Sequence, residues 1–285
     1  MIVTAYCPGH ISGFFKRVAG KDRDATGSIG AGIVIDPGVT VTVTPARQTS
    51  IRIVRKPARG PFRQVADNSP PIASALREIG MDARVVTTCR LPIGAGFGLS
   101  AAALLATLTA ANRAGNLGLS LHEIARIAHE TEIAHRTGLG DVAACQDGGR
   151  VWRTGPGIDG HIERFFDMPD PVYAVSFGPI HTPTVLGSPD QMRRVSRAFP
   201  GGEPVNPAVF FSACRRFSRQ SSIETMEVGH VLAACNAEGV DAAMTMLGNG
   251  VFAYGSRAGA VLRPFGTVYP CSMAHGGPRI IREEP

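Results

Sequence analysis

The sequence predicts a mixed α+β fold in two units, and three features carry that prediction. β-branched runs interrupted by glycine and proline dominate residues 1–56, which is typical of strands. A glycine-rich turn at residues 94–98 leads into a helix rich in alanine and leucine. A proline- and glycine-rich stretch at residues 154–171 then marks a boundary. We therefore divide the chain into residues 1–165 and 166–285.

In the first unit we expect strands at residues 2–5, 30–35, 39–44 and 83–88, and helices at residues 69–80, 100–114 and 120–135. The segment Thr40–Thr44 alternates with the period of two that is typical of a strand. Pro70 and Pro71 suit the first turn of a helix. Ser120 lies three residues before Glu123, which is the spacing of a capping box at a helix start.

The second unit is predicted to continue the mixture of strands and helices. We expect strands at residues 171–177, 251–254 and 266–272, and helices at residues 208–218, 222–237 and 241–246. The sequence contains neither an internal repeat nor a low-complexity linker. These elements indicate a second α+β unit.

Composition excludes several classes of protein. The 285 residues are 44% hydrophobic and 18% charged, which is typical of a soluble globular protein. The longest apolar runs, such as Ala101–Ala106, are far shorter than the ~18 residues of a membrane-spanning helix. Residues 1–7 lack the basic patch and apolar stretch of a signal peptide. Six cysteines without paired spacing suggest free thiols in a reducing compartment, so we expect a cytoplasmic protein.

The net charge of +6 raises the question of nucleic-acid binding. The basic residues are dispersed, and aromatic residues make up only 6% of the chain, without the basic and aromatic interleaving that base stacking requires. A mild positive field suits anionic small molecules such as nucleotide phosphates and carboxylates. We therefore expect neither a nucleic-acid partner nor a membrane partner.

The segment from Leu91 to Leu104 is the most informative part of the chain. Its glycines at positions 94, 96 and 98 allow a tight turn, and the helix that follows points its N-terminal N–H groups toward the turn. Such a turn binds anions such as triphosphate oxygens, although a plain glycine-rich connection would have the same spacing. No Gly-Lys-Ser/Thr follows, which excludes a Walker A loop, and the spacing differs from the dinucleotide-binding fingerprint.

Two carboxylates form the second candidate feature. Glu132 is expected near the end of a helix, and Asp141 follows a glycine-containing loop that can return toward it. One carboxylate would bind Mg²⁺, and the other would accept or orient the proton of an attacking hydroxyl. Glu130 is the alternative to Glu132 as the metal ligand, and both glutamates could instead be solvated helix residues.

The loop resembles the Pro-x-x-x-Gly-Leu-Gly-Ser-Ser-Ala-Ala loop of the GHMP kinase superfamily. Phe97 and Leu99 stand where that pattern has its Leu and its first Ser. The resemblance implies ATP as the phosphoryl donor, bound by Pro92, Gly94, Ala95, Gly96, Phe97, Gly98, Leu99, Ser100 and Ala101. It also implies that Ser100 and Glu132 hold Mg²⁺ and that Asp141 is the catalytic base. Ser100 would in addition be an N-cap of the helix.

Within that superfamily, two segments are similar to archaeal pantoate kinases. They are Pro8-Gly-His-Ile-Ser-Gly-Phe-Phe15 and the reduced glycine turn Met246-Leu-Gly-Asn249. We expect the acceptor site to include His10, Ser28, His129, Arg153 and Asn249. The resemblance implies that Ser28 lies in the acceptor pocket, and His129 is three residues before Glu132 on the same helix face. Arg153, rather than Arg150, would meet the carboxylate of the acceptor.

The implied fold is an N-terminal α+β nucleotide-binding domain packed on a C-terminal ferredoxin-like α+β domain, with the site between them. The implied reaction transfers the ATP γ-phosphoryl group to the primary hydroxyl of pantoate, giving 4-phosphopantoate for coenzyme A synthesis. The expected partner is this hydroxy acid, and a homodimer is one arrangement open to the chain. The alternatives are a kinase with a homoserine-like acceptor, a nucleotide-binding regulator without turnover, and a basic nucleic-acid-binding protein.

Overall fold

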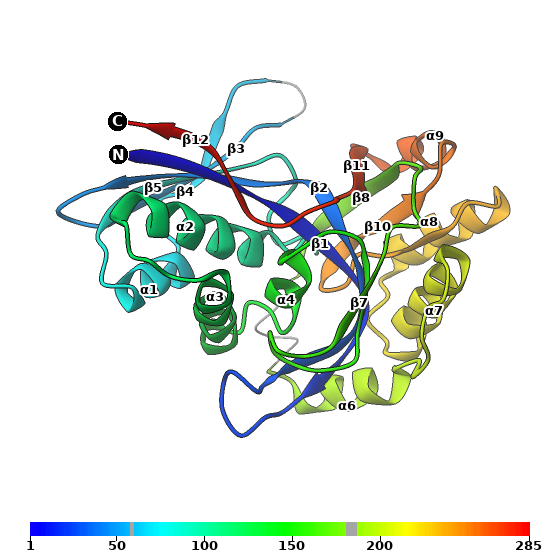
Figure 1. The fold of residues 1–285 in the computed structure, drawn as a ribbon. Coiled ribbons are helices and arrows are strands. Elements are labelled where there is room, and N and C mark those ends of the chain that lie inside the picture. Colours follow the sequence, from blue (N-terminus) through cyan, green and yellow to red (C-terminus); the bar gives the residue numbers. More distant parts are fainter. Residues whose placement is uncertain (58–59, 181–186) are drawn as a thin grey trace.

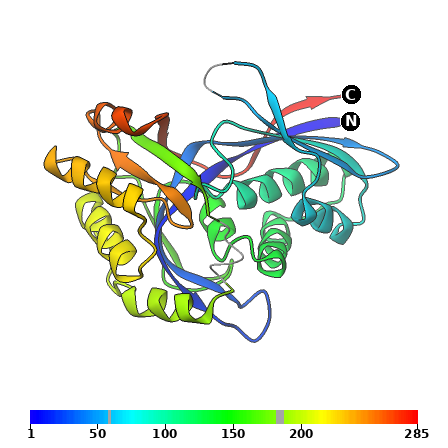
Figure 2. The same ribbon diagram turned by 180° about the vertical axis from the view of Figure 1, so that it is seen from behind.

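The computed structural model describes residues 1–57, 60–180 and 187–285. Its strands form one continuous sheet in the order β4-β3-β5-β2-β11-β8-β10-β9, with β1 pairing with β2 and β12, and β6 with β2 and β7. Figures 1 and 2 show α1, α2 and α3 at one end of the molecule and α6, α7 and α8 at the other. The long strands β1 and β2 extend between the two groups of helices (Figure 1). The mixed α+β class predicted from the sequence is confirmed.

The earlier strands are β1 (Ile2–Val18), β2 (Gly27–Pro45), β3 (Ser50–Arg55), β4 (Arg63–Ala66), β5 (Ala83–Cys89), β6 (Arg150–Arg153) and β7 (Ile162–Phe165). β1 and β2 are far longer than the strands expected within them. Their antiparallel pairing shifts register between Cys7 and Gly9 and between Ser12 and Phe14. Glycine and proline therefore mark irregularities inside β1, not its end, because bulges accommodate them.

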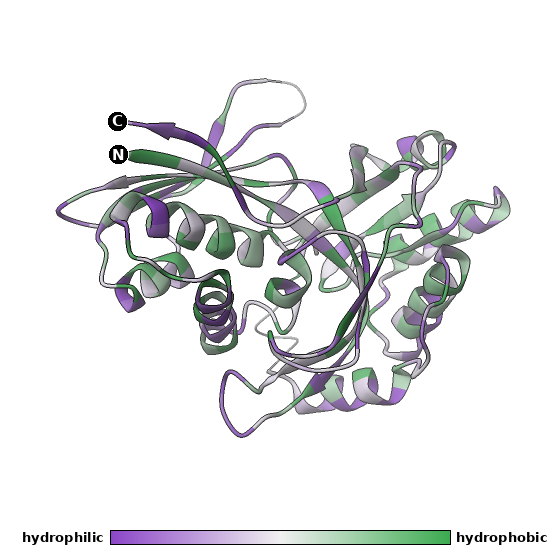
Figure 3. Ribbon diagram, in the orientation of Figure 1, coloured by the Kyte–Doolittle hydropathy of each residue, from purple (hydrophilic) through white to green (hydrophobic). Residues whose placement is uncertain are grey.

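The helices of the first half are α1 (Pro70–Glu78), α2 (Leu99–Gly115), α3 (Leu121–His135) and α4 (Asp141–Cys145). α2 packs against β1 and β2 on one side and α1 and α3 on the other. Every residue from Ala101 to Ala111 is buried, and Figure 3 shows this helix as predominantly hydrophobic. The expected capping box at Ser120 and Glu123 is present at the start of α3.

The later elements are β8 (Val172–Pro179), α6 (Pro189–Ala198), α7 (Pro207–Gln220), α8 (Met226–Ala237), β9 (Ala242–Met244), β10 (Gly248–Tyr254), α9 (Ala258–Leu262), η1 (Arg263–Phe265), β11 (Tyr269–Met273) and β12 (Arg279–Glu284). β11 pairs with both β2 and β8 and so joins the two parts of the sheet. β12 pairs with β1, which brings the two ends of the chain together (Figure 1). No helix in the described part of the chain is long and apolar enough to cross a bilayer.

The structure corrects one predicted element. Residues 241–246 were expected to be helical, but Ala242–Met244 form the buried strand β9, paired with β10. Alanine and methionine favour helices, yet the pairing and burial of this short segment override that local preference. The sequence also gave no sign of α6, of the β6–β7 hairpin or of β12, an edge strand of mostly charged residues.

Candidate active site

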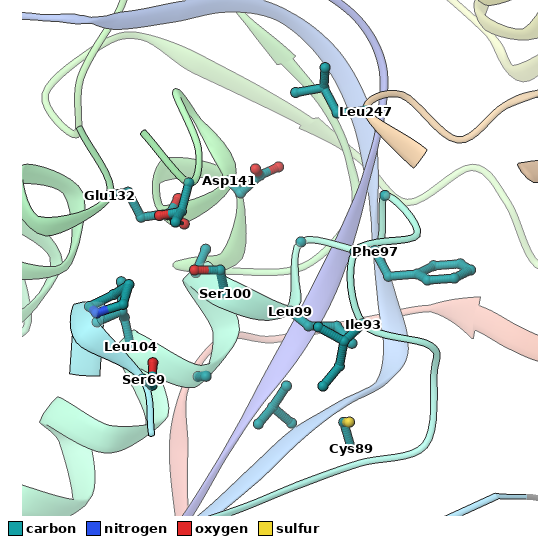
Figure 4. Close-up of a pocket in the computed structure, with 18 of the residues that line it drawn as sticks. Ser69, Cys89, Ile93, Phe97, Leu99, Ser100, Leu104, Glu132, Asp141 and Leu247 are labelled. Atoms are coloured by element: carbon teal, nitrogen blue, oxygen red, sulfur yellow. Dashed lines mark hydrogen bonds between the residues drawn. The ribbon is translucent and has the colours of Figure 1, made fainter. Parts of the chain in front are cut away.

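A cavity of about 540 Å³ lies at the N-terminus of α2 (Figure 4). Both Glu132 and Asp141 line this cavity. So do seven of the residues expected to bind the nucleotide: Gly94, Gly96, Phe97, Gly98, Leu99, Ser100 and Ala101. Pro92 faces an adjoining cavity of about 410 Å³, and Ala95 is buried against Gly248. The glycine loop and the two carboxylates, distant in sequence, therefore share one cavity.

The glycine loop places backbone groups at the start of α2. Gly94, Gly96 and Gly98 have φ values of 75°, 81° and 59°, a region that glycine adopts without strain. Gly98, not Ser100, is the N-cap of α2, which corrects the expected cap; Ser100 lies in the first turn. Gly98 has no side chain that could cap the helix, so the first N–H groups of α2 can donate to an anion at the positive end of the helix dipole.

Asp141 begins α4 and faces the cavity with a side chain that is 22% exposed. His10 Nδ1 lies 2.6 Å from Asp141 Oδ1, and the Ser12 hydroxyl approaches the same oxygen at 3.5 Å. Burial alone would raise the pKa of Asp141, but the hydrogen bond from His10 and the charge of Arg153 outweigh it. The pKa of Asp141 therefore lies below its ordinary value, and the carboxylate is ionised at neutral pH.

Glu132 is only 1% exposed and lies beside Asp141 (Figure 4). A Cβ added at Gly138 would overlap Glu132 Oε2 and lie 3.1 Å from Asp141 Oδ2, so both carboxylates face this glycine. The Thr137 hydroxyl donates to Glu132 Oε1 at 3.1 Å, whereas Oε2 has no partner among the described residues. Burial, with the charge of Asp141, raises the pKa of Glu132 to about 8.

This arrangement fits a divalent cation. A buried carboxylate oxygen without a partner, next to a second carboxylate, lacks a compensating positive charge. In the described part of the chain no group of three or more His, Cys, Asp or Glu side chains could hold a metal on its own. Mg²⁺ usually takes one or two carboxylates together with phosphates and water. Glu130, in contrast, forms an ion pair with Arg126 at 3.1 Å and does not line the cavity.

Arg153 and Ser28 contact each other close to Asp141. Arg153 is 2% exposed and donates from Nη1 to the carbonyl and the hydroxyl of Ser28, at 3.0 Å and 3.1 Å. A Cβ added at Gly140, the residue before Asp141, would overlap this guanidinium. The charge of Arg153 is thus buried close to Asp141.

The other expected acceptor residues are placed differently. His129 is buried, and its Nε2 lies 2.8 Å from the Thr26 carbonyl. Asn249 accepts a hydrogen bond from the Thr225 hydroxyl at 2.8 Å. Neither residue lines the cavity as far as the described residues define it. His10 is fully buried and contacts Asp141.

Sequence reasoning did not identify the other cavity residues. Ser12 contacts Asp141 and lies in the segment from Pro8 to Phe15 that resembles pantoate kinases, so a sequence signal for it existed. Thr137 contacts Glu132 from the loop before Asp141. The apolar walls come from β3, β5, α1 and α2, and no motif marks them: Ile53, Pro71, Ile72, Cys89 and Leu104, with Thr87 of β5 among them. The Thr87 hydroxyl is buried there and has no partner among the described residues.

Comparisons with known proteins agree with this geometry. Residues 69–149 match the family model of the GHMP kinases N terminal domain. The chain is 45% identical over 279 residues to the pantoate kinase of Methanospirillum hungatei, an alignment that covers 98% of this chain and 96% of that protein.

Solved structures show the same fold at lower identity. A phosphotransferase related to the CoA biosynthesis pathway superposes with a TM-score of 0.82 over 99% of both chains, at 22% identity. MDDEF, solved in complex with MVAPP, AMPPCP and magnesium, superposes with a TM-score of 0.70 over 99% of this chain and 100% of its own, at 13% identity. Since the similarity to the Methanospirillum protein extends over nearly the whole of both chains, the chain belongs to the pantoate kinase family of the GHMP kinases.

Proposed function

We propose that this protein transfers the γ-phosphoryl group of ATP to the primary hydroxyl of pantoate, giving 4-phosphopantoate. The single observation that carries the proposal is the ionised Asp141 beside the glycine loop, in a cavity that also holds Glu132. A carboxylate placed next to a phosphate-binding turn suits proton removal from an attacking hydroxyl. The pantoate kinase of Methanospirillum hungatei, at 45% identity, supports the choice of acceptor.

The cavity suggests how the nucleotide lies. Its apolar walls, which include Ile53, Ile72 and Leu104, suit the adenine base. The Thr87 hydroxyl, which has no partner among the described residues, could form a hydrogen bond to that base. The phosphates would follow the backbone of residues 96–101 toward the N-terminus of α2. This orientation brings the γ-phosphoryl group to Asp141.

Glu132 and Ser100 would hold the Mg²⁺ that accompanies the nucleotide. Both side chains line the cavity, in which Ser100 lies near Glu132 (Figure 4), and Glu132 Oε2 has no hydrogen-bond partner among the described residues. When bound, the cation neutralises charge on the phosphates. Glu132 must be ionised to bind it, and the positive charge itself would favour that form by lowering the carboxyl pKa.

Asp141 performs the proton transfer of the reaction. The hydroxyl oxygen of pantoate attacks the γ-phosphorus as its proton passes to Asp141. The bond between the γ-phosphorus and the oxygen that bridges it to the β-phosphate breaks, and ADP leaves with that oxygen. The buried positive charge of Arg153 near the base favours an acceptor that carries a carboxylate.

The test is an assay of ADP release with ATP and Mg²⁺, using pantoate, homoserine, mevalonate and galactose as acceptors, with the product identified by mass spectrometry. We expect turnover selective for pantoate and a product carrying one added phosphoryl group. Turnover with another acceptor would overturn the choice of pantoate as the substrate but would still show that the protein is a kinase. A folded, ATP-binding protein that shows no turnover with any acceptor would indicate a nucleotide-binding regulator.

The six buried free cysteines further support a site of action in the cytoplasm.

A further inference from the structure

His10 contacts both the base and the glycine loop. It lies within β1, and its side chain is fully buried. Its ring Nδ1 lies 2.6 Å from Asp141 Oδ1, and its backbone N–H donates to the Phe97 carbonyl at 3.0 Å. A Cβ added at Gly98 would also lie 2.9 Å from the His10 carbonyl oxygen. One residue of β1 therefore links the loop that would hold the phosphates to the carboxylate that would remove the proton.

The surroundings of the ring determine where its proton lies. Burial lowers the pKa of His10 more than Asp141 raises it, so the imidazole is neutral. A neutral imidazole has one N–H, and only a proton on Nδ1 can be donated to the carboxylate of Asp141. Nε2 then carries a lone pair and no proton, which agrees with its lack of a hydrogen-bond partner among the described residues.

Gly32 of β2 leaves room for this ring. His10 pairs with Val34 in the β1–β2 ladder, and Gly32 lies two residues along the same strand. A Cβ added at Gly32 would overlap His10 Nε2. The ring is thus confined between β2 and Asp141, and its Nδ1 is directed at the carboxylate.

We infer that His10 is a positioning residue that holds Asp141 in place through an Nδ1–H hydrogen bond and fixes it relative to the phosphate-binding loop. The inference rests on the proposed function, because it assumes that Asp141 is the base. His10 was expected from the sequence to contact the acceptor. Its complete burial and its contact with Oδ1 indicate that it acts through Asp141 instead.

The structure supplies a reason why Asp141 needs such a contact. Asp141 is the first residue of the five-residue helix α4, and it follows a loop that contains Gly138 and Gly140. Its Oδ2 faces Gly138, close to the buried Glu132, whereas its Oδ1 contacts His10 Nδ1. The contact with His10 therefore holds the carboxylate from the side away from Gly138.

Two variants of similar polarity separate positioning from general support of the fold. Asparagine places its amide N–H₂ near the position of histidine Nδ1, whereas glutamine places it near Nε2, toward Gly32. We expect His10→Asn to keep kcat within about fivefold of the unmodified protein, and His10→Gln to lose about 10²-fold, the effect of a misplaced catalytic group. ATP affinity should change less than threefold in both variants, since the contact to Phe97 is made by the backbone. Equal losses of kcat in the two variants would overturn the inference.

A spectroscopic measurement tests the same point without turnover and without a variant. The ¹⁵N chemical shifts of the His10 ring in the unmodified protein should show a neutral imidazole protonated at Nδ1. A proton on Nε2 alone would contradict the inference. If the protein showed no turnover with pantoate yet had the Nδ1–H form, the proposed function would fail and the contact from His10 to Asp141 would stand.

Discussion

At the scale of single residues, Glu132 and Asp141 show how surroundings divide two identical functional groups. Both carboxylates face Gly138, but Asp141 accepts a hydrogen bond from His10 and lies near Arg153. Glu132 is nearly fully buried, with one oxygen unpartnered among the described residues. Their pKa values therefore move in opposite directions, which supports the proposal that Asp141 takes up the proton and that Glu132 binds the cation.

The pH dependence of stability tests this division. The pKa of Glu132 in the folded protein is about 8, above its ordinary value of 4.5, so the folded state binds this proton more tightly than the unfolded state. The contribution is favourable below about pH 4.5 and is lost as the pH rises toward about 8. We expect Glu132→Gln to weaken this decline in the unfolding free energy of the apoprotein between pH 5 and pH 8, by about 1–3 kcal/mol. Denaturant unfolding at the two pH values measures it.

The nucleotide provides the complementary observation for the same variant. Glu132→Gln should weaken Mg²⁺-dependent ATP binding by at least about tenfold, because the amide cannot supply the negative charge that the cation requires. If the variant and the unmodified protein had the same pH dependence of unfolding and the same ATP affinity, Glu132 would not be the metal ligand.

At the scale of elements, the glycine loop is shaped by its contacts with the rest of the protein. A Cβ added at Gly96 would lie 2.9 Å from the Met246 carbonyl oxygen and 3.1 Å from the Gly248 nitrogen. One added at Gly98 would lie 2.9–3.1 Å from atoms of His10. The glycines therefore allow the loop to pack between β1 and the turn before β10.

A pair of glycine substitutions tests this packing. Gly98→Ala places a Cβ against His10, whereas Gly118→Ala has a similar positive φ of 72° with nothing within 4 Å of the added Cβ. Both should lose about 1 kcal/mol of stability from backbone strain, and Gly98→Ala should lose more because its Cβ would lie 2.9 Å from the His10 carbonyl oxygen. Only Gly98→Ala should also weaken ATP binding, by about tenfold or more, in calorimetric titration. Equal ATP affinity in the two variants would show that the loop does not depend on its contact with β1.

The elements predicted correctly are those whose signals are local. The capping box at Ser120 and Glu123 predicts α3, and the apolar composition of residues 100–114 predicts α2. Each of these signals lies within the segment that forms the helix. β9 was missed because its conformation is set by pairing with β10 and not by its alanines. β12 was missed because a charged edge strand has no apolar alternation to reveal it.

At the scale of the whole molecule, the site is assembled from residues as distant in sequence as Ser12 and Leu247. The loop and the two carboxylates could be selected from the sequence because short motifs mark them. The topology of the sheet brings the loop and the two carboxylates together, supplies the apolar walls from β3 and β5, and allows the hydrogen bond between His10 and Asp141. The periodicity of a single sequence does not determine that topology.

The pairing of β12 with β1 makes a testable contribution at this scale. Deletion of residues 279–285 would remove the partner of residues Ile2–Tyr6 and expose an edge of the sheet. If the lost strand pairing is worth about 2 kcal/mol, Tm falls by about 4–8 °C. The turnover of the folded fraction should persist, because β12 does not line the 540 Å³ cavity.

Deletion of Pro285 alone is the matched control, since that residue lies beyond the end of β12. It should leave both Tm and turnover unchanged. An unchanged Tm after deletion of residues 279–285 would show that β12 does not stabilise the sheet.

The central claim is that Asp141 is the base of a phosphoryl transfer, and Asp141→Asn tests it most directly. Asparagine keeps the shape of the side chain and an oxygen that can accept from His10, but it cannot take up the proton. We predict that kcat with pantoate falls by about 10²–10⁴-fold while the Kd for ATP changes less than about threefold. Turnover equal to that of the unmodified protein would contradict the account.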